Sequence, residues 1–206
     1  MAALIEAARA PDFAAEIVLV LSDEPAAPGL AIARQAGVAA EAIDFRNYSG
    51  RAAFEAALDA RLLDARAEIV CLAGFIRILS RTMVERWEGR VLNIHPSLLP
   101  DLPGLRTHER ALAGGRLAHG CTVHFVSPQV DAGPIIAQAT VPVLPGDDVD
   151  ALASRVLREE HKIYPMALDS VARSLRAEFS LPQDGRTARR GGDGGETPRA
   201  GKRKLP

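Results

Sequence analysis

In residues 91–96, a short apolar run is followed by an amide side chain, an imidazole and a proline. The run at 91–92 leads to Asn93, then to His95 and Pro96, and Pro96 removes a backbone donor, so a strand is expected to end there. Side chains alternate along a strand, which puts Asn93 and His95 on one face. Open α/β sheets bind ligands at the carboxyl ends of their strands. This pair therefore marks the expected place for chemistry.

Three other motifs put polar or flexible residues beside apolar runs, and each alone has an ordinary structural interpretation. They are AGFIRIL (residues 73–79), Thr107-His108 and VDAGP (residues 130–134). An aspartate before Ala-Gly-Pro, here Asp131, is commonly a turn former, and a strand-end histidine is commonly structural. Cys121 and His124 lack the second Cys/His pair that a zinc site requires, so no metal is expected.

The composition fits one globular domain. The chain has 206 residues, 48% hydrophobic and 25% charged, which is enough for a core of ordinary size. Each of its two cysteines lies within an apolar run, as small core residues of a reducing compartment do. No basic leader follows Met1, and no uncharged apolar run approaches the roughly 18 residues of a membrane span. We therefore expect a cytoplasmic monomer or weak homodimer without a membrane partner.

Short strand-type runs alternate with longer helix-type runs along the chain. This order predicts an α/β fold with a mainly parallel, Rossmann-like sheet and helices on both faces. Strands are predicted at residues 16–22, 40–44, 68–73 and 91–95. Helices are predicted at residues 1–9, 28–36, 51–65, 80–87, 107–113 and 148–175. The runs at 121–126 and 134–143 are separated only by a loop, so they predict an antiparallel C-terminal strand pair.

The end of the chain differs in composition from the rest. We place the domain at residues 1–181 and a tail at 182–206, where seven basic and three acidic residues give +4 and leave −5 for the domain. So few apolar residues predict a disordered Gly/Arg-rich segment. The tail has no aromatic side chain to stack on bases, so a solvating segment is favoured over nucleic-acid binding.

The beginning of the chain lacks a usual feature of doubly wound sheets. Such sheets normally open with a central strand and a glycine-rich turn whose backbone donors hold a phosphate. Here the sequence opens in a predicted helix, and its first glycine is Gly29. Without a central strand, neighbouring strands would keep unpaired backbone groups, at about 1–3 kcal/mol for each one buried. We expect that Met1 is not the natural start, and that a form extended by such a strand and loop is the active one.

Taken in order, the motifs resemble the phosphoribosylglycinamide formyltransferase family, folate-dependent enzymes of purine synthesis, over residues 1–175. The most specific segments are AGFIRILS (73–80), LNIHPSLLP (92–100), PGLRTH (103–108), HGCTVHFV (119–126), VDAGPIIAQ (130–138) and EHKIYP (160–165). The resemblance implies the formyltransferase fold, 10-formyltetrahydrofolate as co-substrate, no metal, and glycinamide ribonucleotide as formyl acceptor. The sequence departs from the family in lacking the first strand and phosphate loop, and in having Arg106 where a histidine is common.

The resemblance also implies roles for single residues. The catalytic group would be Asn93, His95 and Asp131. The folate-binding residues would be Arg51, Ile76, Arg77, Ile78, Leu79, Asn93, Ser127, Pro128, Gln129, Val130 and Asp131. The ribonucleotide would be contacted by Met1, Ala2 and Glu160.

Formyl transfer to an amine needs the residue types found at these positions. Its tetrahedral intermediate carries an oxyanion, which the Asn93 amide and a protonated His95 can stabilise; losing one such donor typically costs about 3 kcal/mol. Asp131 can accept the proton that the amine loses, directly or through water, and its charge favours cationic His95. Residues 76–79 can provide apolar walls and backbone partners for a pterin ring. Arg51 can pair with folate carboxylates.

Three alternatives remain open. A methionyl-tRNA formyltransferase normally carries an additional C-terminal domain, and a formyl-folate hydrolase normally carries a regulatory domain ahead of the catalytic one. The sequence shows neither. The third alternative is a non-catalytic folate-binding fragment, because of the segment expected before Met1.

Overall fold

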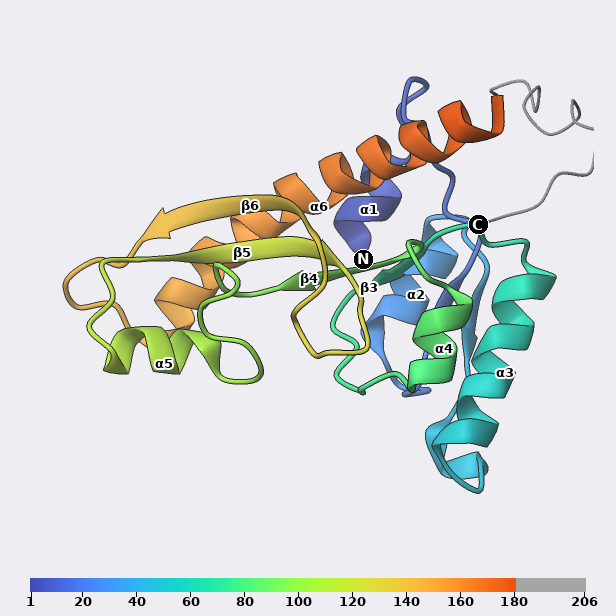
Figure 1. Ribbon diagram of the computed structural model, residues 1–206, viewed down its shortest axis with the longest axis horizontal. Helices are drawn as coiled ribbons and strands as arrows, with labels where there is room; N and C mark the ends of the chain where they lie inside the picture. The colour runs from blue at the N-terminus through green and yellow to red at the C-terminus, as the bar shows by residue number, and fades with distance from the viewer. Residues whose placement is uncertain (181–206) are drawn as a thin grey trace, which may run out of the picture.

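The structure of the protein, a computed structural model, describes residues 1–180. Its helices are α1 (Ala2–Ala7), α2 (Pro28–Gln35), the 3-10 helix η1 (Phe45–Asn47), α3 (Arg51–Asp64), α4 (Arg81–Arg86), α5 (Thr107–Ala113) and α6 (Val149–Ser180). Its strands are β1 (Val20–Ser22), β2 (Ala40–Ala42), β3 (Val70–Leu72), β4 (Val91–His95), β5 (Ala118–Phe125) and β6 (Ile135–Pro142). Strands and helices alternate up to α5, and the β5–β6 hairpin and α6 complete the described chain (Figure 1).

The strands form two sheets, with the orders β1-β2 and β3-β4-β5-β6. β1 runs parallel to β2, and β3 runs parallel to β4. β5 is antiparallel to both β4 and β6. Among the described strands, β1 and β3 therefore each pair along one edge only, whereas β4 is paired on both sides.

Local sequence explains where several helices begin. Ser80 caps α4, because its Oγ accepts a hydrogen bond from Met83 N at 3.2 Å. Asp148 does the same for α6, accepting from Ala151 N at 2.7 Å. Pro28 is the first residue of α2, a position where the missing N–H leaves no bond unmade.

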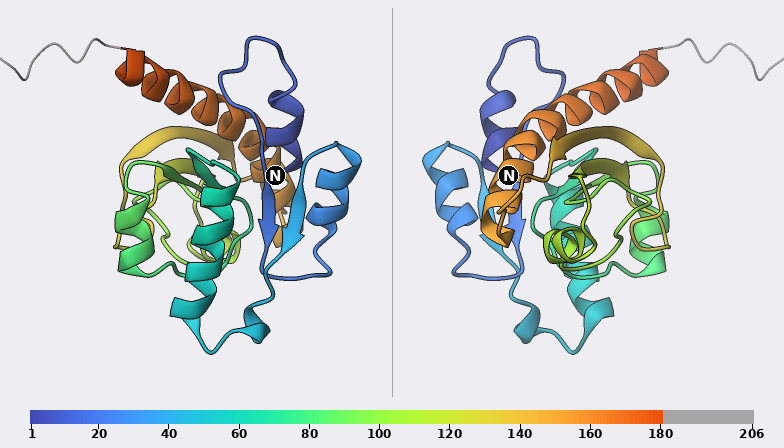
Figure 2. Two further views of the ribbon diagram at one scale, coloured as in Figure 1. Left: turned by 90° about the vertical axis from the view of Figure 1, so that its right-hand side faces the viewer. Right: turned by 90° about the vertical axis from the view of Figure 1, so that its left-hand side faces the viewer.

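Helices cover both faces of the larger sheet (Figure 2). On one face, α1 and α6 pack in a cluster that includes Leu92 and Val123, both fully buried. On the other face, α4 packs against β3 and β4 through Met83 and Trp87. The Tyr164 hydroxyl of α6 lies 2.8 Å and 3.0 Å from backbone oxygens of β3 and β4, which fixes the helix over these two strands.

The mixed α/β arrangement confirms the predicted fold class, and β4 and α5 begin and end where the sequence predicts. The strands expected at 16–22 and 68–73 are shorter, at Val20–Ser22 and Val70–Leu72. Each of these two strands forms backbone hydrogen bonds with a neighbour along one edge alone, which accounts for its shorter span. The division into two sheets was not part of the predicted Rossmann-like arrangement, and α6 continues five residues beyond its predicted end at 175.

Other sequence expectations have mixed outcomes. The predicted tail at 182–206 lies outside the described residues. Within residues 1–180, no helix combines the length and apolar character that crossing a membrane requires. Cys71, which is half-buried, and Cys121, which is buried, are free thiols, and burial raises the pKa of each to about 12.

Candidate active site

The end of β4 holds Asn93 and His95 on one face of the sheet, as the sequence predicts. His95 is the last residue of the strand, and Pro96 follows it directly. The antiparallel register with β5 sets Asn93 directly opposite His124. The amide and imidazole therefore meet a second imidazole from the neighbouring strand.

Both nitrogens of the His95 ring face polar atoms, although only 8% of the side chain is exposed. Nε2 lies 3.1 Å from the backbone oxygen of Leu102. A carbonyl oxygen can only accept a hydrogen bond, so Nε2 carries a proton. Nδ1 faces the carboxylate of Asp131, 3.5 Å from Oδ2. Nδ1 is therefore the nitrogen of His95 that can gain or lose a proton within the site.

Asp131 reaches this position from the loop between β5 and β6. Its φ is 54°, in the left-handed region that aspartate tolerates better than most residues. Oδ2 accepts a hydrogen bond from Gly104 N at 2.8 Å, which holds the carboxylate against the loop after β4. Oδ1 lies 3.8 Å from Nε2 of His124. One carboxylate thus faces both imidazoles, with 10% of its side chain exposed.

His124 belongs to the site, although sequence reasoning assigned it only to a strand. Its Nδ1 donates to Phe125 O at 2.8 Å, which leaves Nε2 to accept from Asn93 Nδ2 at 3.3 Å. Burial lowers the pKa of His124, against smaller raising effects of the Phe125 carbonyl and of Asp131. The ring is therefore neutral in this arrangement and fixes the Asn93 amide. The β4–β5 register was the signal that could have located it.

Gly133 allows the loop that carries Asp131 to close against β5. A Cβ at this position would lie 1.8 Å from the backbone oxygen of Phe125. That same oxygen accepts the hydrogen bond from His124 Nδ1. Any larger residue at 133 would therefore displace the backbone that orients both His124 and Asp131.

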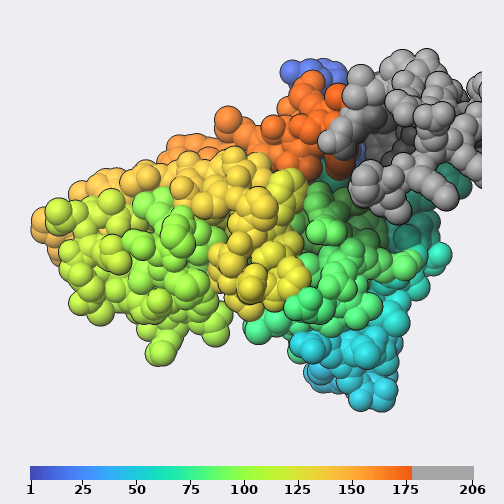
Figure 3. Space-filling view, in the orientation of Figure 1, coloured from blue at the N-terminus to red at the C-terminus, as the bar shows by residue number. Residues whose placement is uncertain are grey.

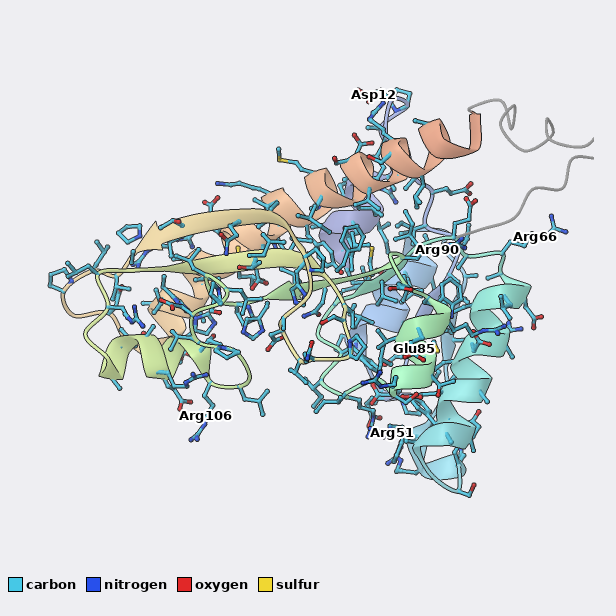
Figure 4. The ribbon with its side chains drawn as sticks, viewed as in Figure 1. Asp12, Arg51, Arg66, Glu85, Arg90 and Arg106 are labelled. Atoms are coloured by element: carbon cyan, nitrogen blue, oxygen red, sulfur yellow. The ribbon has the colours of Figure 1, made fainter. Side chains whose placement is uncertain are left out.

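A cavity of about 440 Å³ lies at the amino end of α3 and the segment after β3. Its lining residues are Phe45, Arg51, Phe54, Glu55, Phe75, Ile76, Arg77, Ile78 and Leu79. The structure thus brings Arg51, labelled in Figure 4, to the same cavity as the predicted folate residues 76–79. Ile76 and Ile78 are 85% and 62% exposed. Adjacent exposed apolar side chains are typical of a ligand-facing surface.

Two charged side chains hold the segment of residues 75–80 in place. Arg77 Nε donates to Asp23 at 2.6 Å, and its guanidinium lies 3.9 Å from the ring centroid of Phe45. The buried Glu55 carboxylate accepts from Ser80 N at 2.7 Å and also from the Ser80 hydroxyl. Arg77 is thus engaged in local structure at this wall of the cavity.

The loop of residues 127–131 connects the catalytic group to the surface. Ser127 Oγ donates to Gln129 O at 2.8 Å, while Pro128, Gln129 and Val130 are exposed. Val126 and Leu79 pack against the same hydrophobic cluster, so the loop begins close to the wall of the 440 Å³ cavity. Figure 3 shows this loop at the surface, between the end formed by α5 and the end formed by α3. Neither the loop nor Asn93 is among the lining residues of that cavity.

Of the three predicted ribonucleotide contacts, the structure brings two close together. Met1 precedes α1, and the exposed Ala2 is the first residue of that helix. Burial raises the pKa of Glu160, and the nearby amino group of Met1 acts in the opposite direction. The Glu160 carboxylate and the Met1 backbone nitrogen are thus near enough for their charges to interact.

Two further histidines lie on the side of His95 away from Asn93's partner His124, and one of them, His119, is close enough to His95 for their charges to interact. His108 Nδ1 lies 3.1 Å from His119 Nε2. Burial, then the neighbouring His108 and His95, lower the pKa of His119 to about 4. Arg106, at the position where the resembling family commonly has histidine, is exposed and has a left-handed φ of 55°. Within residues 1–180, no group of three or more His, Cys, Asp or Glu side chains is arranged to hold a metal ion.

Asn93, His95 and Asp131 bring an oriented amide, an imidazole and a carboxylate together in a nearly closed site. Asn93 has one amide hydrogen directed to His124 and a second one for a ligand. His95 and Asp131 form a pair across which a proton can move. Such an arrangement can stabilise an oxyanion and accept a proton from an attacking nucleophile.

Comparisons with known proteins show that the chain is similar to formyl transferases. A family model described as "Formyl transferase" matches residues 1–168. Phosphoribosylglycinamide formyltransferase of Escherichia coli K12 is 43% identical over 166 residues, covering 81% of this chain and 78% of the relative. The crystal structure of phosphoribosylglycinamide formyltransferase from Brucella melitensis has a TM-score of 0.80 and 52% identity, covering 84% of this chain and 88% of that one.

Similar segments also occur within much longer proteins. The trifunctional purine biosynthetic protein adenosine-3 of Bos taurus is 50% identical over 170 residues. That match covers 82% of this chain but 17% of the bovine protein. The chain therefore spans about a sixth of the length of this curated relative.

Proposed function

Because this chain belongs to the formyl transferase family, we propose that it transfers the formyl group of 10-formyltetrahydrofolate to the amine of glycinamide ribonucleotide. The product is formylglycinamide ribonucleotide, an intermediate of purine synthesis in the cytoplasm. The observation that carries the proposal is the convergence of Asn93, His95 and Asp131 in one nearly closed site. The names of the E. coli relative and of the Brucella structure support the choice of acceptor.

The first step is attack of the amine nitrogen on the formyl carbon. A new carbon–nitrogen bond forms, and the electrons of the carbonyl bond move to oxygen to give an oxyanion. The second N–H of Asn93 and the protonated Nδ1 of His95 donate to that oxygen. His124 keeps the amide oriented before the substrates arrive, so little reorganisation is needed as charge develops.

Proton transfers complete the reaction. The attacking nitrogen gives up a proton to Asp131, directly or through water, and the folate N10 receives a proton from His95 as the carbon–N10 bond breaks. Asp131 is then protonated and His95 is neutral. Because Nδ1 and Oδ2 lie 3.5 Å apart, the proton can return from Asp131 to His95. The catalytic group is thereby restored without a metal or a covalent intermediate.

The binding of the two substrates follows from the surfaces around this group. We assign the folate to the 440 Å³ cavity, with residues 76–79 along the pterin and Arg51 paired with the glutamate carboxylates. The loop of Ser127 to Val130 follows Val126, which packs against the same hydrophobic cluster as Leu79 of the cavity wall, and leads to Asp131. We assign the ribonucleotide to the surface around Met1, Ala2 and Glu160.

The experiment supplies 10-formyltetrahydrofolate with one of three acceptors and identifies the product by chromatography. Glycinamide ribonucleotide should be formylated, whereas water alone and methionyl-tRNA should not accept the group. Using protein in excess over folate gives a single turnover, which detects slow transfer. Release of formate without an acceptor would indicate a hydrolase, and formylation of methionyl-tRNA would indicate the other superfamily activity.

Three variants connect this activity to the site. Asn93→Ala, His95→Ala and Asp131→Ala should each reduce the rate of formyl transfer by about a hundredfold or more, as expected when a charge-stabilising donor is lost. Asp101→Ala is the matched control, because Asp101 is exposed and pairs with Arg116 on the surface. Near-normal rates in the three site variants would exclude this catalytic group.

A further inference from the structure

The side chain of Arg110 extends from α5 back to the loop that precedes this helix. Its Nη1 donates to the backbone oxygen of Pro103 at 2.6 Å and to that of Leu105 at 3.3 Å. An Nη atom carries two hydrogens, so each oxygen can receive one of them. Long side chains of a helix lean toward its amino end, which brings the guanidinium to this loop. The two oxygens lie on either side of Gly104, whose N–H donates to Asp131.

One peptide group, between Pro103 and Gly104, connects Arg110 to Asp131. A trans peptide unit is planar, and its C=O and N–H point in opposite directions. Here the oxygen accepts from Arg110 at 2.6 Å, and the N–H donates to Oδ2 of Asp131 at 2.8 Å. The plane of this peptide is therefore fixed at both ends. A cationic donor on the oxygen also polarises the peptide, which strengthens its N–H as a donor to the carboxylate.

The backbone of this loop is strained on both sides of the peptide. The φ angle is 53° at Leu102, 79° at Gly104 and 55° at Arg106. Glycine adopts the left-handed region freely, but in leucine and arginine the Cβ crowds the following carbonyl oxygen. Such conformations persist only where the surrounding structure holds them. Contacts from outside the loop are therefore needed to keep Gly104 directed at Asp131.

The two halves of the loop are held from different sides. Ser97, just after β4, has its Oγ 2.7 Å from the backbone oxygen of Asp101 and 3.1 Å from that of Leu102. These hydrogen bonds fix the loop as far as Leu102. The hydrogen bonds from Arg110 begin at the next residue and include both oxygens that flank Gly104. The half of the loop that contacts Asp131 is thus held from α5.

We propose that Arg110 is a positioning residue, which acts through the Pro103–Gly104 peptide to keep the Asp131 carboxylate directed at His95. The oxygen of Asp131 that accepts from Gly104, Oδ2, is also the one that lies 3.5 Å from Nδ1 of His95. A carboxylate that turns from this direction exchanges protons less readily, because proton transfer depends on the alignment of the two groups. This role rests on the proposed function, in which Asp131 accepts the proton of the attacking amine.

Two substitutions of Arg110 test this role in steady-state formyl transfer. Arg110→Met keeps an unbranched stem and a similar helix propensity but removes the donors, so kcat should fall about tenfold, with less than a twofold change in the KM of either substrate. Arg110→Lys keeps a cationic donor and should recover at least a third of the parental kcat. A loss smaller than threefold in Arg110→Met, a change confined to KM, or no recovery in Arg110→Lys would overturn the proposal.

The matched control is Arg116→Met, because Arg116 is also an exposed arginine that contacts this loop. It pairs with the side chain of Asp101 at 3.1 Å, so its loss should leave kcat within twofold of the parent. A second comparison places Arg110→Met in the Asp131→Asn background. The rate should fall less than twofold further there, because a residue that acts through a carboxylate adds little once that carboxylate is lost. A further tenfold loss would overturn the proposal.

Hydrogen exchange of the Gly104 amide, followed by NMR on the full chain without substrates, tests the same contact independently of activity. Exchange should be at least tenfold faster in Arg110→Met than in the parent, and within twofold of the parent in Arg116→Met. Amides of β5 should exchange as in the parent, which separates a local effect from a general loss of stability. Unchanged exchange at Gly104 in Arg110→Met would overturn the proposal. If the parent transfers no formyl group, the proposed function fails, and this exchange comparison alone decides whether Arg110 holds the peptide.

Discussion

The side-chain amide of Asn93 lies 3.3 Å from Nε2 of His124, across the β4–β5 register pair. His124 is in turn fixed by its hydrogen bond to the Phe125 carbonyl at 2.8 Å. The direction of the Asn93 amide is therefore set by a chain of two hydrogen bonds that ends on the backbone. We therefore propose that His124 acts on the reaction through Asn93, as a positioning residue.

Replacing His124 should slow formyl transfer without preventing it. His124→Phe keeps an aromatic ring but removes the acceptor for Asn93, so kcat should fall about tenfold, with less than a twofold change in the folate KM. His124→Gln retains a side-chain acceptor and should recover part of the loss. A change confined to KM, or identical rates in both variants, would argue against orientation of the amide.

Removing the Asn93 amide should have a larger effect. Asn93→Ala leaves the oxyanion without one of its donors, which typically costs about 3 kcal/mol and reduces kcat by about 10²–10³-fold. The control is Asn47→Ala, because Asn47 is exposed on η1, an element that carries none of the three proposed catalytic residues. Steady-state rates at saturating folate measure the difference. A loss of less than tenfold in Asn93→Ala would contradict the proposed role.

Glu55 should support both stability and folate binding. It is 5% exposed and accepts two hydrogen bonds from Ser80, at the end of the segment that lines the 440 Å³ cavity. Glu55→Ala leaves these donors without partners, so the free energy of unfolding should fall by about 1–3 kcal/mol. The folate KM should rise because the cavity wall loosens.

The matched control for this prediction is Glu85→Ala, because Glu85 is exposed and pairs with the exposed Arg81 on the helix surface. Its urea midpoint and folate KM should stay close to those of the parent. Equal destabilisation by the two variants would show that loss of a helical carboxylate in general, and not loss of the Ser80 hydrogen bonds, accounts for the change.

Stability should decrease as the pH falls below the ordinary pKa of histidine. The pKa of His119 is lowered from 6.5 to about 4, first by burial. Between these values, the unfolded chain binds a proton that the folded chain does not, so the free energy of unfolding falls as pH drops through this window. Urea midpoints at pH 7.5 and 5.0 should therefore differ less in His119→Gln than in the parent. The exposed control His161→Gln should keep the parent's full difference.

Sequence patterns predicted the parts of this protein that depend on local chemistry. The strand end at Asn93 and His95 was predicted from the apolar run at 91–92 and from Pro96, which lacks a backbone donor, and the bounds of β4 agree with it. Residues 76–79 share a cavity with Arg51 as the family resemblance implied. The roles of the individual catalytic and substrate-binding residues stay predictions until variants are measured.

What the sequence did not reveal depends on contacts between distant segments. His124 meets Asn93 only because of the register between β4 and β5, and an offset of one residue would turn it to the other face. The division of the strands into two sheets was likewise not predicted. Its existence depends on which strands pair across the sheets, and each strand's own residues say little about that.

The central claim is that Asn93, His95 and Asp131 act as one catalytic group, and a double-variant cycle tests it most directly. Single-turnover formyl transfer would be measured for the parent, Asn93→Ala, Asp131→Asn and the double variant. Each single variant should lose at least a hundredfold in rate. Because residues that act as a unit have strongly non-additive effects, the rate of the double variant should be close to that of the slower single variant. Near-parental rates in either single variant, or a double variant with the full product of both losses, would contradict the claim.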